Sequence, residues 1–114
     1  MDKVISLLND LGIPYAYDHF AEGESPEPPF ICFRQTQSDN FSADGTAYFK
    51  VADVDIELYT DKKNPETEKR VEKMLSDAGI FFDKEEVWIS SEKLYEVVFG
   101  FAVSDEDMED TYDS

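Results

Sequence analysis

Residues 53–58 read Asp-Val-Asp-Ile-Glu-Leu and alternate strictly between acidic and apolar side chains. Successive side chains of a β-strand point to opposite faces, so this run predicts a strand with its three apolar residues on one face. The acids Asp53, Asp55 and Glu57 then share the other face. A sheet with one packed and one wet face is typical of antiparallel strands.

Further strands are expected on both sides of this run. Phe30–Arg34 and Leu94–Ala102 are rich in β-forming residues. Val87–Ile89, followed by a polar turn into Leu94, is typical of a closing hairpin. Proline, glycine and Asp-Gly turn chemistry predict loops at Ala21–Pro29 and at Gln35–Gly45.

Two segments carry apolar residues at the i, i+3, i+4, i+7 spacing of an amphipathic helix, and each is followed by glycine. The apolar positions are Val4, Leu7, Leu8 and Leu11 in the first segment and Val71, Met74, Leu75 and Ala78 in the second. Gly12 and Gly79 suit the left-handed position that ends a helix. Asn64 and Pro65 mark the start of the second helix as its N-cap and first residue.

The order of these elements predicts an α+β fold, with a largely antiparallel sheet of four to five strands and two helices packed on one face. Residues 1–102 are expected to form this single domain. Residues 103–114 contain six acids and no base. Such a block repels itself and buries little, so it is expected to be an acidic, flexible C-terminal segment.

The charge balance excludes several classes of function. The 114 residues include 27 acids and 10 bases, for a net charge of −17. Clustered bases are needed to grip nucleic acid or anionic lipid, so sequence-specific nucleic-acid binding and membrane docking are not expected. Nine Phe, six Tyr and one Trp oppose a disordered chain. With one cysteine and no apolar run of signal-peptide or membrane-span length, the chain is expected in a reducing cytoplasm.

Catalytic and metal chemistry find little support. His19 beside Asp18 has no recognisable nucleophile partner, so a surface histidine is favoured over a general base in a small hydrolase. Cys32 lies among apolar residues and is expected in the core. Acids two apart on a strand are about 6.6 Å from one another, too far for one ion to bridge unaided. We therefore expect no enzyme, no metal and no cofactor.

Two segments are candidates for contact with other molecules. The Gln35–Gly45 loop places Phe41 among the polar residues Asn40, Asp44 and Gly45, so Phe41 either folds back onto the sheet or contacts a partner. Around the second helix five bases balance five acids. The bases Lys69, Arg70 and Lys73 of this nearly neutral helix are candidates for an interface between subunits.

Several short motifs resemble a known family of small proteins from long-tailed phages and prophages of Gram-positive bacteria. They cover most of residues 1–102 and are moderately specific: Gly12–Tyr15, Tyr17–Phe20, Pro28–Ile31, Asn40–Asp44, Ile56–Thr60 and Asp77–Ile80. The chain resembles the tail terminator, or tail completion, proteins and related head–tail joining proteins.

The resemblance implies a structural virion protein. Its subunits would form a ring, expected to be hexameric, that caps the tail tube, stops its polymerisation and joins it to the head connector. The implied partners are other copies of the chain, the tail tube protein and the head connector protein, with the Gln35–Gly45 loop reaching a neighbour or the tube. Asp53, Asp55 and Glu57 would line a lumen through which DNA passes, at the head–tail junction of a virion assembled in the host cytoplasm.

A different class of function remains open. An acidic phage protein can mimic DNA and block a host defence enzyme that binds DNA. In that case Asp53, Asp55 and Glu57 would belong to an array of acids at phosphate-like spacing.

Overall fold

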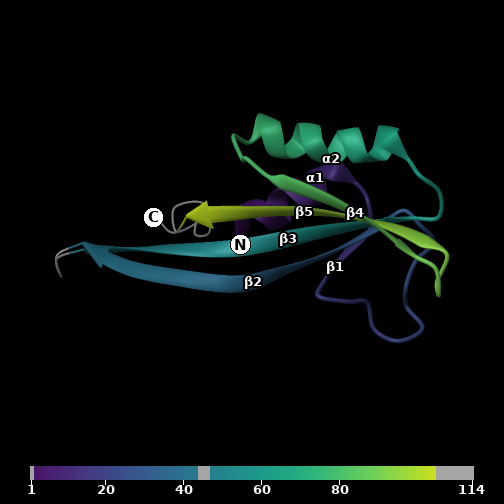
Figure 1. Ribbon diagram of the computed structural model, residues 1–114, viewed down its shortest axis with the longest axis horizontal. Helices are drawn as coiled ribbons and strands as arrows, with labels where there is room; N and C mark the ends of the chain where they lie inside the picture. Colours follow the sequence, from purple (N-terminus) through teal and green to yellow (C-terminus); the bar gives the residue numbers. More distant parts are fainter. Residues whose placement is uncertain (1, 44–46, 105–114) are drawn as a thin grey trace.

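A single five-stranded sheet with two helices forms the protein in the computed structural model, which describes residues 2–43 and 47–104 (Figure 1). The elements are α1 (Asp2–Leu11), β1 (Tyr15–Tyr17), β2 (Phe30–Ala43), β3 (Ala47–Thr60), α2 (Pro65–Asp77), β4 (Asp83–Ile89) and β5 (Leu94–Ser104). The strand order is β1-β2-β3-β5-β4, with β1 parallel to β2 and all other pairs antiparallel. This arrangement confirms the predicted α+β fold.

Both helices end where the sequence predicted. The Asn64 side chain accepts a hydrogen bond from the Thr67 amide at 3.1 Å, which caps the start of α2. Gly79 adopts φ +77° after the last turn, and the Ile80 amide donates to the Leu75 carbonyl at 2.9 Å. Gly12 ends α1 in the same way, with φ +85°.

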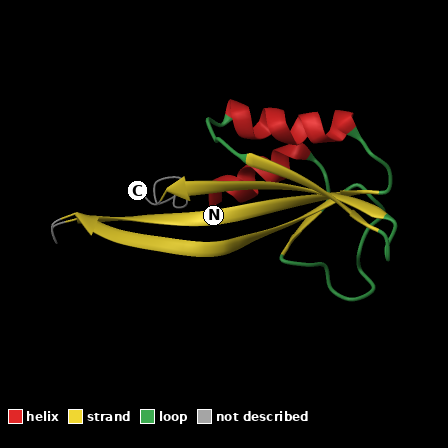
Figure 2. Cartoon of the chain, viewed as in Figure 1, coloured by secondary structure: helices red, strands yellow, loops and turns green. Residues whose placement is uncertain are grey.

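The core lies between the two helices and one face of the sheet (Figure 2). Val54, Ile56 and Leu58 are fully buried, as their alternation with acids predicted. The helices contribute their apolar stripes, and the neighbouring strands add further buried residues, among them Val4, Leu8, Val71, Leu75, Ile31, Phe33, Val97 and Phe99. The other face of the sheet carries no helix (Figure 2), and we call it the open face.

The predicted loop at Gln35–Gly45 is wrong for residues 35–43, which are part of a strand, and its Asp44-Gly45 turn lies outside the described residues. β2 continues to Ala43 and pairs with β3 down to Ala43↔Ala47, with an irregularity in register between Gln35 and Gln37. Ladder hydrogen bonds join backbone groups, so a polar run can extend a hairpin that an apolar run has started. The ends of the two strands, residues 40–43 and 47–50, extend past the end of β5 (Figure 1), and we call them the arm.

β5 is longer than predicted and runs to Ser104. Val103 is only 2% exposed, so the acidic C-terminal segment cannot begin before residue 105. Residues 105–114, on which the predicted flexibility falls, lie outside the described part of the chain.

Candidate functional site

The open face of the sheet carries the three acids that the sequence predicted as a stripe. The strand register places Asp53, Asp55 and Glu57 there, together with the acids Asp83, Glu85 and Glu96 of the neighbouring strands. Among the described side chains that the register assigns to this face, Arg34 is the only base. The face is therefore strongly acidic.

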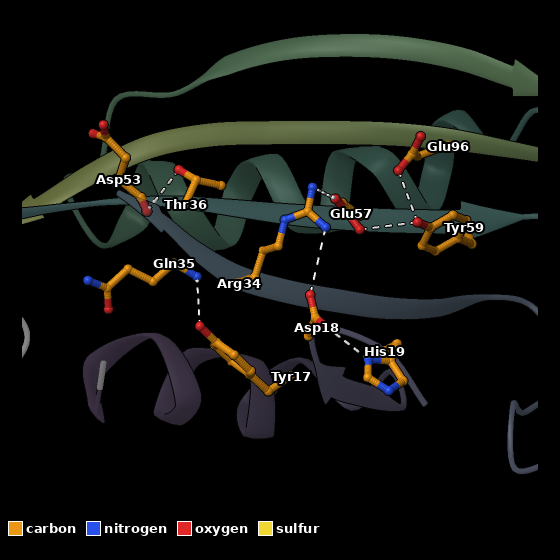
Figure 3. A network of polar contacts seen from close by, with 10 residues as sticks. All are labelled: Tyr17, Asp18, His19, Arg34, Gln35, Thr36, Asp53, Glu57, Tyr59 and Glu96. Atoms are coloured by element: carbon orange, nitrogen blue, oxygen red, sulfur yellow. Dashed lines mark hydrogen bonds and ion pairs between the residues drawn. The ribbon is translucent and has the colours of Figure 1, made fainter. Parts of the chain in front are cut away.

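Arg34 joins two elements of this face (Figure 3). Its Nη2 lies 3.2 Å from Glu57 Oε2, and its Nη1 lies 3.8 Å from Asp18 Oδ1. Asp18 in turn lies 2.9 Å from Nδ1 of His19, whose side chain is 76% exposed. The Arg34 guanidinium thus links the end of β1 to β3.

Glu57 differs from its two acidic neighbours because it is buried, with 5% of its surface exposed, whereas Asp53 and Asp55 are half-buried. Burial raises the pKa of the Glu57 carboxyl, and the Arg34 charge and a hydrogen bond from Tyr59 oppose that rise only in part. Glu57 therefore lies on the face that the alternation predicted, but it is not exposed to water as expected for a wet face.

The Tyr59 hydroxyl lies between two carboxylates, 3.1 Å from Glu57 Oε1 and 2.9 Å from Glu96 Oε2 (Figure 3). A phenol has one proton, so it donates to only one of them at a time. Burial, and then the nearby negative charges, raise the pKa of Tyr59, so the phenol stays protonated. The trio can hold charge and protons at the surface of the sheet, but it contains no activated nucleophile.

A hollow of about 490 Å³ lies beside this network. Gly100 and Ala102 of β5 contribute small residues to its lining, with Asp53, Asp55 and Asp83 around them. A Cβ on Gly100 would lie 3.2 Å from Asp55 Oδ1, so a larger residue there would crowd that carboxylate. Phe81, which also lines the hollow, is 95% exposed.

Phe81 and Gly100 were not among the site residues predicted from the sequence. Two phenylalanines follow α2, and only Phe82 packs on the core, with its ring centroid 5.6 Å from that of Phe99. The available signal was an aromatic pair directly after a helix-ending glycine. Local sequence does not decide which of the two rings turns inward.

Two of the four residues predicted for the interface loop lie on a strand, and the other two lie outside the described residues. Asn40 and Phe41 lie on β2, where their Cα partners are Lys50 and Phe49 of β3. Asp44 and Gly45 lie outside the described residues. Phe41 is therefore part of a strand in the arm, and its contact with a partner remains a prediction.

The bases of α2 have separate structural roles. The Arg70 guanidinium donates to the Leu11 carbonyl at 2.6 Å, which satisfies a backbone acceptor at the end of α1. Lys73 pairs with Asp77 at 2.7 Å, and Lys69 is exposed. The subunit contact through Lys69, Arg70 and Lys73 stays a prediction.

Groups that could support catalysis or metal binding are sparse. Within residues 2–43 and 47–104, no cluster of three or more His, Cys, Asp or Glu side chains has the geometry to hold a metal ion. Cys32 is buried, as predicted, and burial raises the pKa of its thiol. None of the helices in the described ranges has the length and apolar character needed to cross a membrane.

Comparison with known proteins gives a likeness in fold. No protein-family model and no curated protein matches the chain. Among solved structures, the chain is similar to one in the virion of a native gene transfer agent (GTA) particle. The TM-score is 0.60 at 17% sequence identity, over 90% of this chain and 88% of the other.

Proposed function

We propose that this protein is a structural subunit of a phage-like virion, and specifically a tail terminator that forms a ring at the end of the tail tube. The observation that carries the proposal is the fold shared over almost the whole length of a chain from a gene transfer agent virion. The motifs that resemble tail terminator and head–tail joining proteins, such as Tyr17–Phe20 and Ile56–Thr60, support the same function.

The acidic open face supports a position beside DNA. Six acids against one base, Arg34, repel phosphates and supply no cluster of bases for counterion release. A ring that presents this face to its lumen lets DNA pass without holding it. The open face would then be the lumen wall, and the helix-covered face would point away from the DNA.

The same acidity opposes assembly, because each subunit carries a net charge of −17. Salt screens such repulsion, so ring formation is expected to strengthen between about 0.05 M and about 0.5 M NaCl. Sedimentation velocity of the purified chain at the two salt concentrations measures this effect, and electron microscopy of the high-salt sample shows whether the particles are rings. Weaker association at high salt would contradict the electrostatic argument.

Capping of the tail tube tests the terminator role directly. Purified tail tube protein from the same phage or prophage is polymerised with and without this chain, and tube lengths are measured by electron microscopy. We expect shorter tubes with a ring at one end when the chain is present. Tubes of unchanged length, with no chain bound at their ends, would reject the role.

The competing function, a mimic of DNA, is favoured by the acidity of the open face but weakened by the state of Glu57. That carboxylate is buried and pairs with Arg34 at 3.2 Å, so it is not free to imitate a phosphate. Competition with DNA for restriction or nuclease complexes separates the two functions, because a tail terminator is expected not to displace DNA.

A further inference from the structure

The outer edge of β5 is incompletely covered. β5 pairs with β3 from Tyr95 to Ser104, but with β4 only from Leu94 to Gly100. On the β4 side, no described strand pairs with Phe101–Ser104. A strand edge of this kind presents backbone donors and acceptors that can pair with another chain.

The hollow lies directly beside this edge. Phe101 and Ala102 belong both to the uncovered edge and to the lining of the hollow, where Phe81 is 95% exposed. A large apolar ring in water next to two small residues, Gly100 and Ala102, leaves space for an apolar side chain from outside. The edge and the hollow together can accept an extended strand: Phe81 and Ala102 offer an apolar contact, next to the acids Asp53, Asp55 and Asp83 that also line the hollow.

The charge and the aromatic residues of the arm suit contact with this edge and hollow on a second copy. Residues 40–50 contain one acid, Asp44, and one base, Lys50, so their formal charge is zero in a chain whose net charge is −17. They also contain three aromatic residues, Phe41, Tyr48 and Phe49. The arm can therefore approach the acidic surface of a second copy with little electrostatic repulsion.

The arm also needs a partner for its own stability. It extends beyond the last residue pair that joins β3 to β5, Val51↔Ser104, and no described strand flanks it on either side. An isolated two-stranded hairpin is at best marginally stable in water. Pairing with a third strand supplies the missing hydrogen bonds.

We propose that the arm of one copy adds as a strand to the Phe101–Ser104 edge of the next copy and places an aromatic side chain in the hollow against Phe81. The donor and acceptor are different surfaces of the same chain, so the contact is head-to-tail and can close into a ring. The inference rests on the proposed function for its partner, a second copy, and assigns the two surfaces that join.

Two variants test this contact by complementation. The acceptor variant, Phe81→Asp, places a charge at an exposed position in the hollow and keeps the arm. The donor variant replaces residues 40–50 with Asn-Gly between Asp39 and Val51, which face each other across the hairpin. It therefore closes the hairpin with a two-residue turn and keeps Val51, the partner of Ser104 at the acceptor edge. We measure association by sedimentation velocity at about 0.5 M NaCl, where repulsion is screened.

The wild-type chain is expected to associate, and each variant alone is expected to associate at least about tenfold more weakly. An equimolar mixture of the two variants should form a one-to-one dimer and nothing larger, because only one arm and one edge remain usable. Val87→Asp is the matched control, since Val87 is an exposed apolar residue on β4 away from the hollow. This control should associate like the wild type.

A monomeric wild-type chain, wild-type association of Phe81→Asp, or a mixture that forms no dimer would each overturn the inference. The tube-capping assay separates this outcome from failure of the proposed function. If Phe81→Asp still forms rings that cap tubes, the proposed contact is wrong and the proposed function stands. A complemented dimer from a chain that caps no tube would keep the contact and reject the function.

Discussion

In the described part of the chain, one glutamate is buried on each face of the sheet, and the surroundings of the two shift their pKa values in opposite directions. Glu68 of α2, on the helix-covered face, is 3% exposed and lies 2.9 Å from both Lys63 Nζ and Lys84 Nζ. Glu57, on the open face, is 5% exposed and has the single cation Arg34 at 3.2 Å. Burial alone would raise both pKa values, but hydrogen bonds from the two lysines outweigh it at Glu68 and lower its pKa, whereas the pKa of Glu57 is raised.

The difference arises because two of the few bases of this acidic chain form ion pairs between α2 and the sheet. Lys84 also contacts Glu72 of α2, and Lys63 also contacts Glu86 of β4, each at 2.7 Å. These ion pairs join α2 to the edge strand of the sheet. The open face keeps its acids with little compensation, since Arg34 is the one base that the register places there among the described side chains.

The largest expected effect comes from removing both cations from Glu68. The double variant Lys63→Met/Lys84→Met leaves a buried carboxylate without a partner, so the unfolding free energy is expected to fall by more than in any of the variants described below. Urea denaturation measures the loss. Lys73→Met is the matched control, because its i, i+4 pair with Asp77 is exposed and is worth about 0.5 kcal/mol or less. An equally small loss in the double variant would show that Glu68 is solvated.

The same substitution on the two faces gives the next largest contrast. Glu68→Gln removes a stabilising charge and is expected to cost about 2 kcal/mol at neutral pH. Glu57→Gln removes a carboxylate that is already costly to ionise, so the change is expected to stay within about 0.5 kcal/mol of zero. Parallel urea titrations at neutral pH compare the two. Equal losses would mean that the faces do not differ as described.

The two glutamates should also give opposite pH dependences. Glu68 has a lowered pKa when folded, so its stabilisation is present above the ordinary glutamate pKa of about 4.3 and is lost as the pH falls through the folded value. Glu57 has a raised pKa, so its ionisation costs stability as the pH rises above about 4.3 through the folded value, and acid relieves that cost. The differences between wild type and the two Gln variants, measured against pH, should have slopes of opposite sign.

The smallest effect is expected at His19, which is joined to the open face through Asp18 and Arg34. His19→Ala removes a side chain that is 76% exposed and that contacts the neighbouring Asp18 (Figure 3). The unfolding free energy should change by less than about 0.5 kcal/mol. Ring formation and tube capping should be unchanged, and a loss of either would give His19 a role that its exposure does not indicate.

Local patterns predicted the elements that have a strong period or clear end signals. The two helices, the alternating strand at residues 53–58 and the closing hairpin are found where the sequence placed them. The arm was missed because its strands lack a clear alternation and contain turn-forming residues, while the backbone pairing that holds them begins in the apolar part of β2 and β3. The acidic stripe was predicted as a set, but the separate state of Glu57 was not.

The sequence by itself determined which side of each element is apolar, because the periods of the helix and the strand are properties of the local backbone. Only the tertiary structure decided what surrounds each side chain. Asp55 and Glu57 follow the same alternation, yet Glu57 is buried because Arg34 and Tyr59 pack against its carboxylate. In the same way, β4 begins at Asp83, opposite Gly100, and pairs with none of the last residues of β5. Burial and strand edges depend on residues distant in the chain, and no local pattern contains them.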